Sequence, residues 1–169
     1  MYYYLDGGVF SDDITTPEII KHESGISYSL FNIESDDFTL PTPTKPGYDF
    51  IGWVAGGTSD VYPTVTITKG TVGNQSYTAR WKANGNTPYT VNIYYMDKNG
   101  QYQETPDRTK TEIGATDTTA TIPDSAYIKN GFSFDATKSS NSGTITGDGK
   151  LQLSLYYARN QVTWAIVVS

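Results

Sequence analysis

The sequence predicts an α+β fold that is dominated by strands and divided into two small tandem domains. Three observations predict it. Short segments of alternating polar and apolar residues recur along the chain, as in residues 89–96, "YTVNIYYM". Three motifs of the first half return in the same order in the second half. One segment, residues 16–25, carries the start and stop residues of a short helix.

The repeated motifs set the expected domain boundaries. The paired stretches are "YYYLDGG" (2–8) with "IYYMDKNG" (93–100), "PGYDFIGW" (46–53) with "NGFSFDAT" (130–137), and "YTARWKAN" (77–84) with "LSLYYARN" (153–160). We therefore expect domains over residues 1–84 and 85–160, joined at residues 83–88, "ANGNTP", a composition typical of a turn or short hinge. Residues 161–169, "QVTWAIVVS", are interpreted as the first strand of a following unit or as a strand added to the second domain.

The helix is expected in "TTPEIIKHESG". Thr16 is a good N-cap, Pro17 fits the first helical position, and Gly25 can end the helix in the left-handed conformation. It would be about two turns long. A weaker helical candidate in the second half is "DSAYIKNG", with Asp124 as its cap and Gly131 beyond its end.

The stretch "LPTPTKPGYDFIGW" (40–53) is expected to lead an extended chain into a buried strand. Its prolines fix an extended approach, and Gly47 permits a turn. Tyr48 and Phe50 then share one face at period two. Trp53 falls on the opposite parity unless Gly52 marks a β-bulge.

The remaining strands follow from alternation and turn residues. "SYTARW" (76–81) is expected to close the first unit. "YTVNIYYM" runs into "DKNG" (97–100), whose Asn-Gly pair indicates a hairpin. Residues 144–155 also indicate a hairpin, turning at Gly-Asp-Gly. In its second strand Leu153, Leu155 and Tyr157 lie on one face with Leu151.

Composition excludes several classes of protein. The net charge is −6, and the 12 basic residues are scattered, so nucleic acid is not an expected partner. No run of about 18 apolar residues occurs, so we expect no membrane insertion. The chain has no cysteine, which rules out disulfides and thiolate metal sites.

No catalytic or metal site is expected, and no cofactor. His22 is the single histidine and is interpreted as a surface residue of the expected helix. The acidic clusters, Asp12-Asp13 and Glu34 to Asp37, lie in apparent loops and are interpreted as solvated. Asp97 to Gly100 is similar to the start of a calcium loop, but Glu104 follows at position eight instead of twelve, so a hairpin turn is favoured.

Aromatic residues are divided between core and surface. The rings at recurring motif positions are expected in the core: Trp53, Trp81, Tyr95 and Tyr157. A face for binding sugars would use rings on the other side of the strands, such as Tyr3 or Tyr94. The sequence does not localise such a site.

Residues 1–84 resemble the Listeria–Bacteroides repeat, close to the internalin B-repeat. The match consists of Asp6-Gly7-Gly8, the stretch from Leu40 to Trp53, and "YTARW" (77–81). The chain departs from that pattern in a longer segment from Phe10 to Phe38 and in "VAGG" after Trp53. Residues 88–160 resemble the mucin-binding-protein type of repeat through "YTVNIYYMD", "GFSFD" and "SGTITGDGKLQLSLYYARN".

The resemblance implies an elongated pair of β-grasp-like domains, each a short sheet packed on a helix or crossing loop. It also implies tandem arrays attached to the cell wall outside Gram-positive bacteria. The expected function is a non-catalytic stalk, spacer or adhesion segment whose partners are neighbouring repeats and a host glycan or protein. One alternative is a dedicated glycan- or host-protein-binding adhesin module. The second alternative is a fragment of a secreted carbohydrate-active enzyme.

Overall fold

The computed structural model describes residues 1–15, 18–21 and 26–162. The chain divides into two compact units, Met1–Asn84 and Gly85–Ser169, each with a hydrophobic core of its own. Every regular element of the described residues is a strand. The fold is therefore all-β, and the α+β expectation is wrong.

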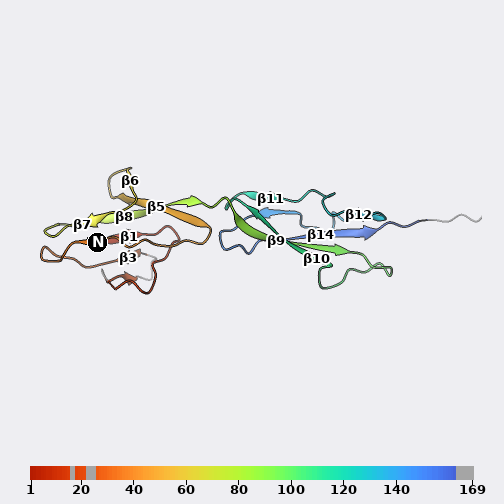
Figure 1. Ribbon diagram of the computed structural model, residues 1–169, viewed down its shortest axis with the longest axis horizontal. Helices are drawn as coiled ribbons and strands as arrows, with labels where there is room; N and C mark the ends of the chain where they lie inside the picture. The colour runs from red at the N-terminus through yellow and green to blue at the C-terminus, as the bar shows by residue number, and fades with distance from the viewer. Residues whose placement is uncertain (16–17, 22–25, 163–169) are drawn as a thin grey trace, which may run out of the picture. The chain divides into compact units, whose positions relative to one another are not determined.

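The main sheet of the first unit has six strands, with β1 and β8 near its centre (Figure 1). In spatial order they are β2 (Ile20–Lys21), β3 (Ile26–Tyr28), β1 (Tyr2–Tyr4), β8 (Ser76–Ala83), β5 (Tyr48–Ala55) and β6 (Val61–Tyr62). β1 runs parallel to β8, whereas the other pairings are antiparallel. The expected closing strand at residues 76–81 is confirmed as part of β8.

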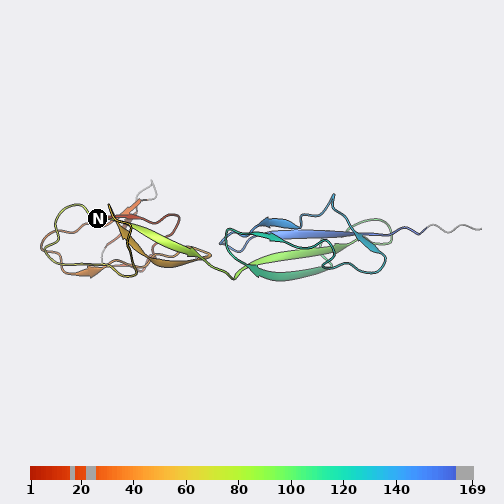
Figure 2. The same ribbon diagram turned by 90° about the horizontal axis from the view of Figure 1, so that it is seen from above.

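The main sheet of the second unit has four strands (Figure 2). Their order is β10 (Arg108–Gly114), β9 (Thr87–Tyr95), β14 (Gln152–Arg159) and β12 (Phe132–Phe134). β9 and β14 are parallel, and the two outer pairings are antiparallel. This arrangement repeats the order β3-β1-β8-β5 of the first unit, with the same pattern of directions.

A two-stranded sheet contributes to the core of each unit. β4 (Phe38–Thr39) pairs with β7 (Thr66–Ile67), and β11 (Thr119–Thr121) pairs with β13 (Ser142–Thr144). Ile67 belongs to the first core with Trp53, and Ala120 belongs to the second core with Leu155. The β-grasp-like expectation called for a helix or crossing loop against each sheet, and a β-grasp fold is not established.

A β-bulge at Gly52 brings Trp53 into the core. The β5–β8 register shifts between Phe50 and Gly52, and Gly52 has φ +142°. The extra residue reverses the side-chain alternation, so Trp53 is buried and packs against Phe50 with ring centroids 5.2 Å apart. The sequence required a bulge at Gly52 if Trp53 was to lie on the same face as Tyr48 and Phe50, and this bulge is confirmed.

Neither helical expectation holds for the described residues. Ile20–Lys21 forms β2 and pairs with β3, while residues 16–17 and 22–25 lie outside the described part of the chain. A two-turn helix is marginal in isolation, and pairing of β-branched Ile20 opposite Tyr28 overrides the cap residues. In the second candidate, Ala126 N donates to Pro123 O (2.9 Å) and Ile128 N to Ser125 O (3.3 Å), which forms turns and no helix.

One hairpin expectation is wrong, and the other holds only with a longer connection than the sequence indicated. β13 pairs with β11 instead of β14, so residues 144–155 do not form a simple hairpin. The "DKNG" turn exists, with Gly100 at φ +78°, but β9 and β10 begin to pair only at Ile93 and Arg108. Residues 161–162 form no strand, and residues 163–169 lie outside the described part.

Candidate binding site

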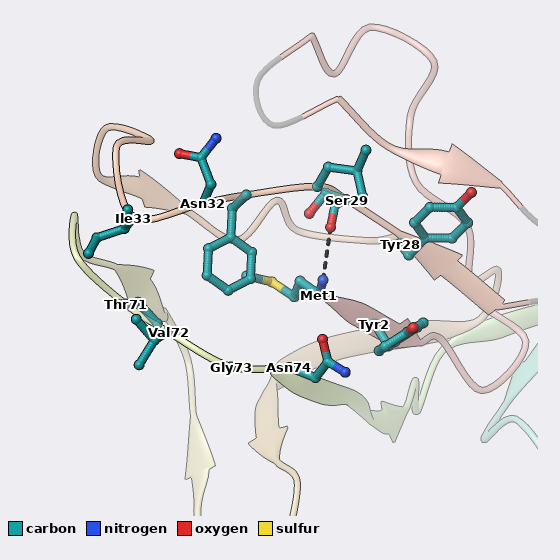
Figure 3. Close-up of a pocket in the computed structure, with 12 residues that line it drawn as sticks. Met1, Tyr2, Tyr28, Ser29, Asn32, Ile33, Thr71, Val72, Gly73 and Asn74 are labelled. Atoms are coloured by element: carbon teal, nitrogen blue, oxygen red, sulfur yellow. Dashed lines mark hydrogen bonds between the residues drawn. The ribbon is translucent and has the colours of Figure 1, made fainter.

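A hollow of the first unit lies between two loops at the end of the β1–β3 pair (Figure 3). We call it the apolar pocket, after the aliphatic side chains of Leu30, Ile33 and Val72 at its rim. Its volume is about 610 Å³, within the range of ligand pockets. Its lining residues are Met1, Tyr2, Tyr28, Ser29, Leu30, Phe31, Asn32, Ile33, Thr71, Val72, Gly73 and Asn74.

The floor of the apolar pocket is fixed by backbone pairing. The β1–β3 pairing ends at Tyr2 and Tyr28, and two hydrogen bonds beyond it join Met1 to Ser29. The Met1 nitrogen donates to the Ser29 carbonyl (2.8 Å), as Figure 3 shows, and Ser29 N donates to the Met1 carbonyl (3.1 Å). Below them the buried Ser29 hydroxyl bonds the Tyr3 hydroxyl (2.9 Å), and burial raises the pKa of Tyr3.

The rim of the apolar pocket exposes aliphatic side chains. Leu30 is 79% exposed, Ile33 61% and Val72 70%. Their loops are held by local bonds: the Asn32 side-chain oxygen accepts from Glu34 N (2.8 Å), and Gly70 N donates to the Ile33 carbonyl (3.2 Å). Apolar side chains gathered around a hollow are typical of an interaction site.

A second hollow shares a wall with the apolar pocket. We call it the acidic groove. It encloses about 280 Å³ and is lined by Glu18, Leu30, Phe31, Ser35, Asp36, Asp37 and Phe38. Leu30 and Phe31 line both hollows. Its three carboxylates have no basic side chain in the lining, although Lys69 lies nearby, 3.5 Å from Asp36.

Three residues of the two acidic clusters, Asp12, Asp13 and Asp37, make local contacts. Asp12 pairs with Lys21, whose hydrogen bond and charge lower the pKa of Asp12. Asp13 accepts a bond from the Ser11 hydroxyl (3.3 Å), and Asp37 accepts one from Lys69 N (2.7 Å). His22 lies outside the described residues.

Asp97, considered for a calcium loop, organises a turn. Its carboxylate accepts bonds from Gln101 N and Asn99 N, each 2.8 Å long, and these bonds lower the pKa of Asp97. Within the described part of the chain, no group of three potential metal-ligating side chains comes together. In that same part no helix has the length and apolar character needed to cross a membrane.

The two rings named for a sugar-binding face are both covered. Tyr3 is completely buried in the first core. Tyr94 is stacked on Tyr156 with ring centroids 4.4 Å apart, and Tyr102 packs edge-on against Tyr156. The exposed rings of β1 are the neighbours of Tyr3, at positions 2 and 4.

The rings expected in the cores divide into two groups. Trp53 and Tyr157 are buried, as expected. Trp81 and Tyr95 are partly buried and pack against the two cores.

Comparison of the chain with protein-family models, with curated proteins and with solved structures gave no match.

Sequence reasoning missed the apolar pocket. The available indication was "SLFNI" (29–33), an apolar run inside a segment otherwise rich in polar loop residues. Its partner loop, residues 71–74, is about forty residues away along the chain. Only the fold brings the two loops together.

Proposed function

We propose that this chain is a non-catalytic, load-bearing spacer of a bacterial cell-surface protein, in keeping with the resemblance of its motifs. The observation that carries the proposal is the position of the terminal strands. In each unit the first and last strands of the main sheet, β1 with β8 and β9 with β14, are parallel neighbours. A spacer transmits tension through the ends of its domains.

Parallel terminal strands resist tension in a particular way. The chain enters a unit at the start of the first strand and leaves at the end of the last strand. Because these strands run in the same direction, their outer ends lie at opposite ends of the shared ladder. Tension then slides one strand along the other and loads all ladder hydrogen bonds together, instead of opening them one at a time.

The two units differ in the length of this ladder. β1 and β8 share three residue pairs, from Tyr2 with Ser76 to Tyr4 with Thr78. β9 and β14 share six, from Thr90 with Gln152 to Tyr95 with Tyr157. We therefore expect the second unit to withstand more force than the first.

Single-molecule force spectroscopy with handles at the two chain ends tests the proposal. We expect two separate unfolding events, with the first unit yielding at the lower force. The 84 residues of the first unit correspond to about 300 Å of extended chain, at up to about 3.6 Å per residue. One cooperative event, or extension without a force peak, would contradict the proposal.

Adhesion is a second candidate function, and the apolar pocket with its exposed rim favours it. A spacer whose surface is only solvated has no need to expose Leu30, Ile33 and Val72 together. The two functions are compatible, because tension passes along the β1–β8 and β9–β14 ladders, while the pocket lies between two loops at the end of the β1–β3 pair.

A further inference from the structure

We propose that the apolar pocket and the acidic groove together bind one extended segment of a partner polypeptide. One apolar side chain of that segment enters the pocket, and a neighbouring lysine or arginine lies along the groove. This inference rests on the adhesive function proposed above and not on the load-bearing one.

The apolar pocket selects an uncharged group. Its lining side chains are aliphatic, aromatic, thioether, hydroxyl or amide, and the one charged group in the lining, the Met1 N-terminal ammonium, already donates to the Ser29 carbonyl (2.8 Å). Tyr2 and Tyr28 form one wall with ring centroids 6.4 Å apart, and Leu30 and Val72 stand on the rim. Covering these exposed side chains removes apolar surface from water, which favours binding of an apolar anchor.

The acidic groove selects a cation beside that anchor. Glu18, Asp36 and Asp37 line it and are exposed. The Lys69 ammonium lies 3.5 Å from Asp36, and the Lys69 backbone N–H donates a hydrogen bond to Asp37. The three carboxylates of the groove therefore have a single nearby cation among the described residues, Lys69. Because the groove and the pocket share Leu30 and Phe31, one segment reaches both. Such charge complementarity steers a basic partner and fixes its register.

The same contacts favour a polypeptide over a sugar. A sugar needs several free hydrogen-bonding side chains around its ring, but the Asn32 amide oxygen already accepts from Glu34 N and Ser35 N. Figure 3 shows the Asn32 side chain turned away from Met1. The rim is aliphatic, and the two tyrosine rings are tilted by 46° from each other, so they form no flat stacking platform.

The test begins with a random dodecapeptide display library selected on the full chain, followed by affinity measurement on an enriched peptide. We expect enriched peptides to carry an aliphatic or aromatic residue close to lysine or arginine. Leu30→Ser combined with Val72→Ser should weaken binding about tenfold or more. Glu18→Gln combined with Asp36→Asn should weaken it about threefold, and added salt should reduce that difference.

Matched controls separate the site from general surface effects. Ile113→Ser removes a similarly exposed aliphatic side chain in the second unit, and Asp60→Asn removes a carboxylate next to β6, at the other edge of the first sheet. Both should leave affinity unchanged. Leu30 and Val72 are largely exposed, so their substitution should not change the thermal unfolding temperature.

Three results would overturn the inference: no enriched sequence, enrichment without basic residues, or equal binding by both pocket variants and the wild type. Binding on a glycan array that is lost in Tyr2→Ala and retained in Glu18→Gln/Asp36→Asn would likewise replace it with a sugar site. Each of these leaves the force measurement unaffected, so failure of the binding site is distinguishable from failure of the spacer.

Discussion

Gly52→Ala tests the structural account of the bulge that places Trp53 in the core. Gly52 has φ +142°, a conformation that is essentially restricted to glycine, and an alanine there costs about 1–3 kcal/mol. Its Cβ would also lie 2.6 Å from the Tyr62 carbonyl oxygen and 2.8 Å from a Val61 methyl group. Relief requires moving the β6 backbone, which adds about 1–3 kcal/mol.

Together these terms lower the free energy of unfolding of the first unit by about 2–6 kcal/mol. The matched control is Gly57→Ala. Gly57 also has a positive φ, +81°, but its Cβ would meet nothing within 4 Å. This variant should therefore cost only about 1–2 kcal/mol.

The assay is guanidinium unfolding followed by tryptophan fluorescence. In a Trp164→Phe background the two remaining tryptophans, Trp53 and Trp81, both report on the first unit. Equal losses in Gly52→Ala and Gly57→Ala would refute the reasoning, because the close approach of β6 to β5 would then have no energetic consequence.

Three further predictions concern the second unit. Leu155→Ala should lower the free energy of unfolding of this unit by about 2–5 kcal/mol and leave the first unit unchanged, as measured by amide hydrogen exchange; loss of protection in both units would contradict their independence. Thr87→Val should lower the free energy of unfolding of the second unit by about 1–3 kcal/mol, because it leaves the Thr116 hydroxyl without its buried partner at 2.6 Å. Replacing both threonines by valine should recover part of that loss, as measured by chemical denaturation in a double-mutant cycle. Strictly additive effects of the two substitutions would argue against the hydrogen bond. Burial, with the Asp135 hydrogen bond, raises the pKa of Tyr102 from 10.0 to about 12. The protonated Tyr102 hydroxyl therefore stabilises the folded second unit fully below pH 10, and this stabilisation is lost as the pH rises towards about 12. Alkaline denaturation should show this loss in the wild type and less of it in Tyr102→Phe; identical pH profiles would count against it.

Local patterns predicted the strands well where neighbouring residues decide the conformation. Leu153, Leu155 and Tyr157 alternate with polar residues and are all buried. The prolines before Gly47 and the glycine at position 52 likewise act through their own backbone preferences.

The predictions that were wrong depend on pairing between segments that are far apart in the sequence. Ile20 lies in a segment with good helix-capping residues, yet its pairing with Tyr28 makes it a strand. On β1 the sequence placed Tyr3 on the face opposite the core, and this prediction is wrong, because the core contains Tyr3 while Tyr2 and Tyr4 are exposed. The apolar pocket depends on two loops that only the β-sheet brings together, so composition could not locate it.

The direction of loading tests the central claim, that the parallel terminal strands of each unit bear tension. The chain lacks cysteine, so Lys98→Cys and Asn160→Cys supply unique attachment points just beyond the same end of the β9–β14 ladder. Pulling between them opens that ladder one pair at a time, whereas pulling from the chain ends shears it. We expect the second unit to unfold at a clearly lower force when pulled from positions 98 and 160. Equal forces in the two directions would contradict a load-bearing role for the ladder.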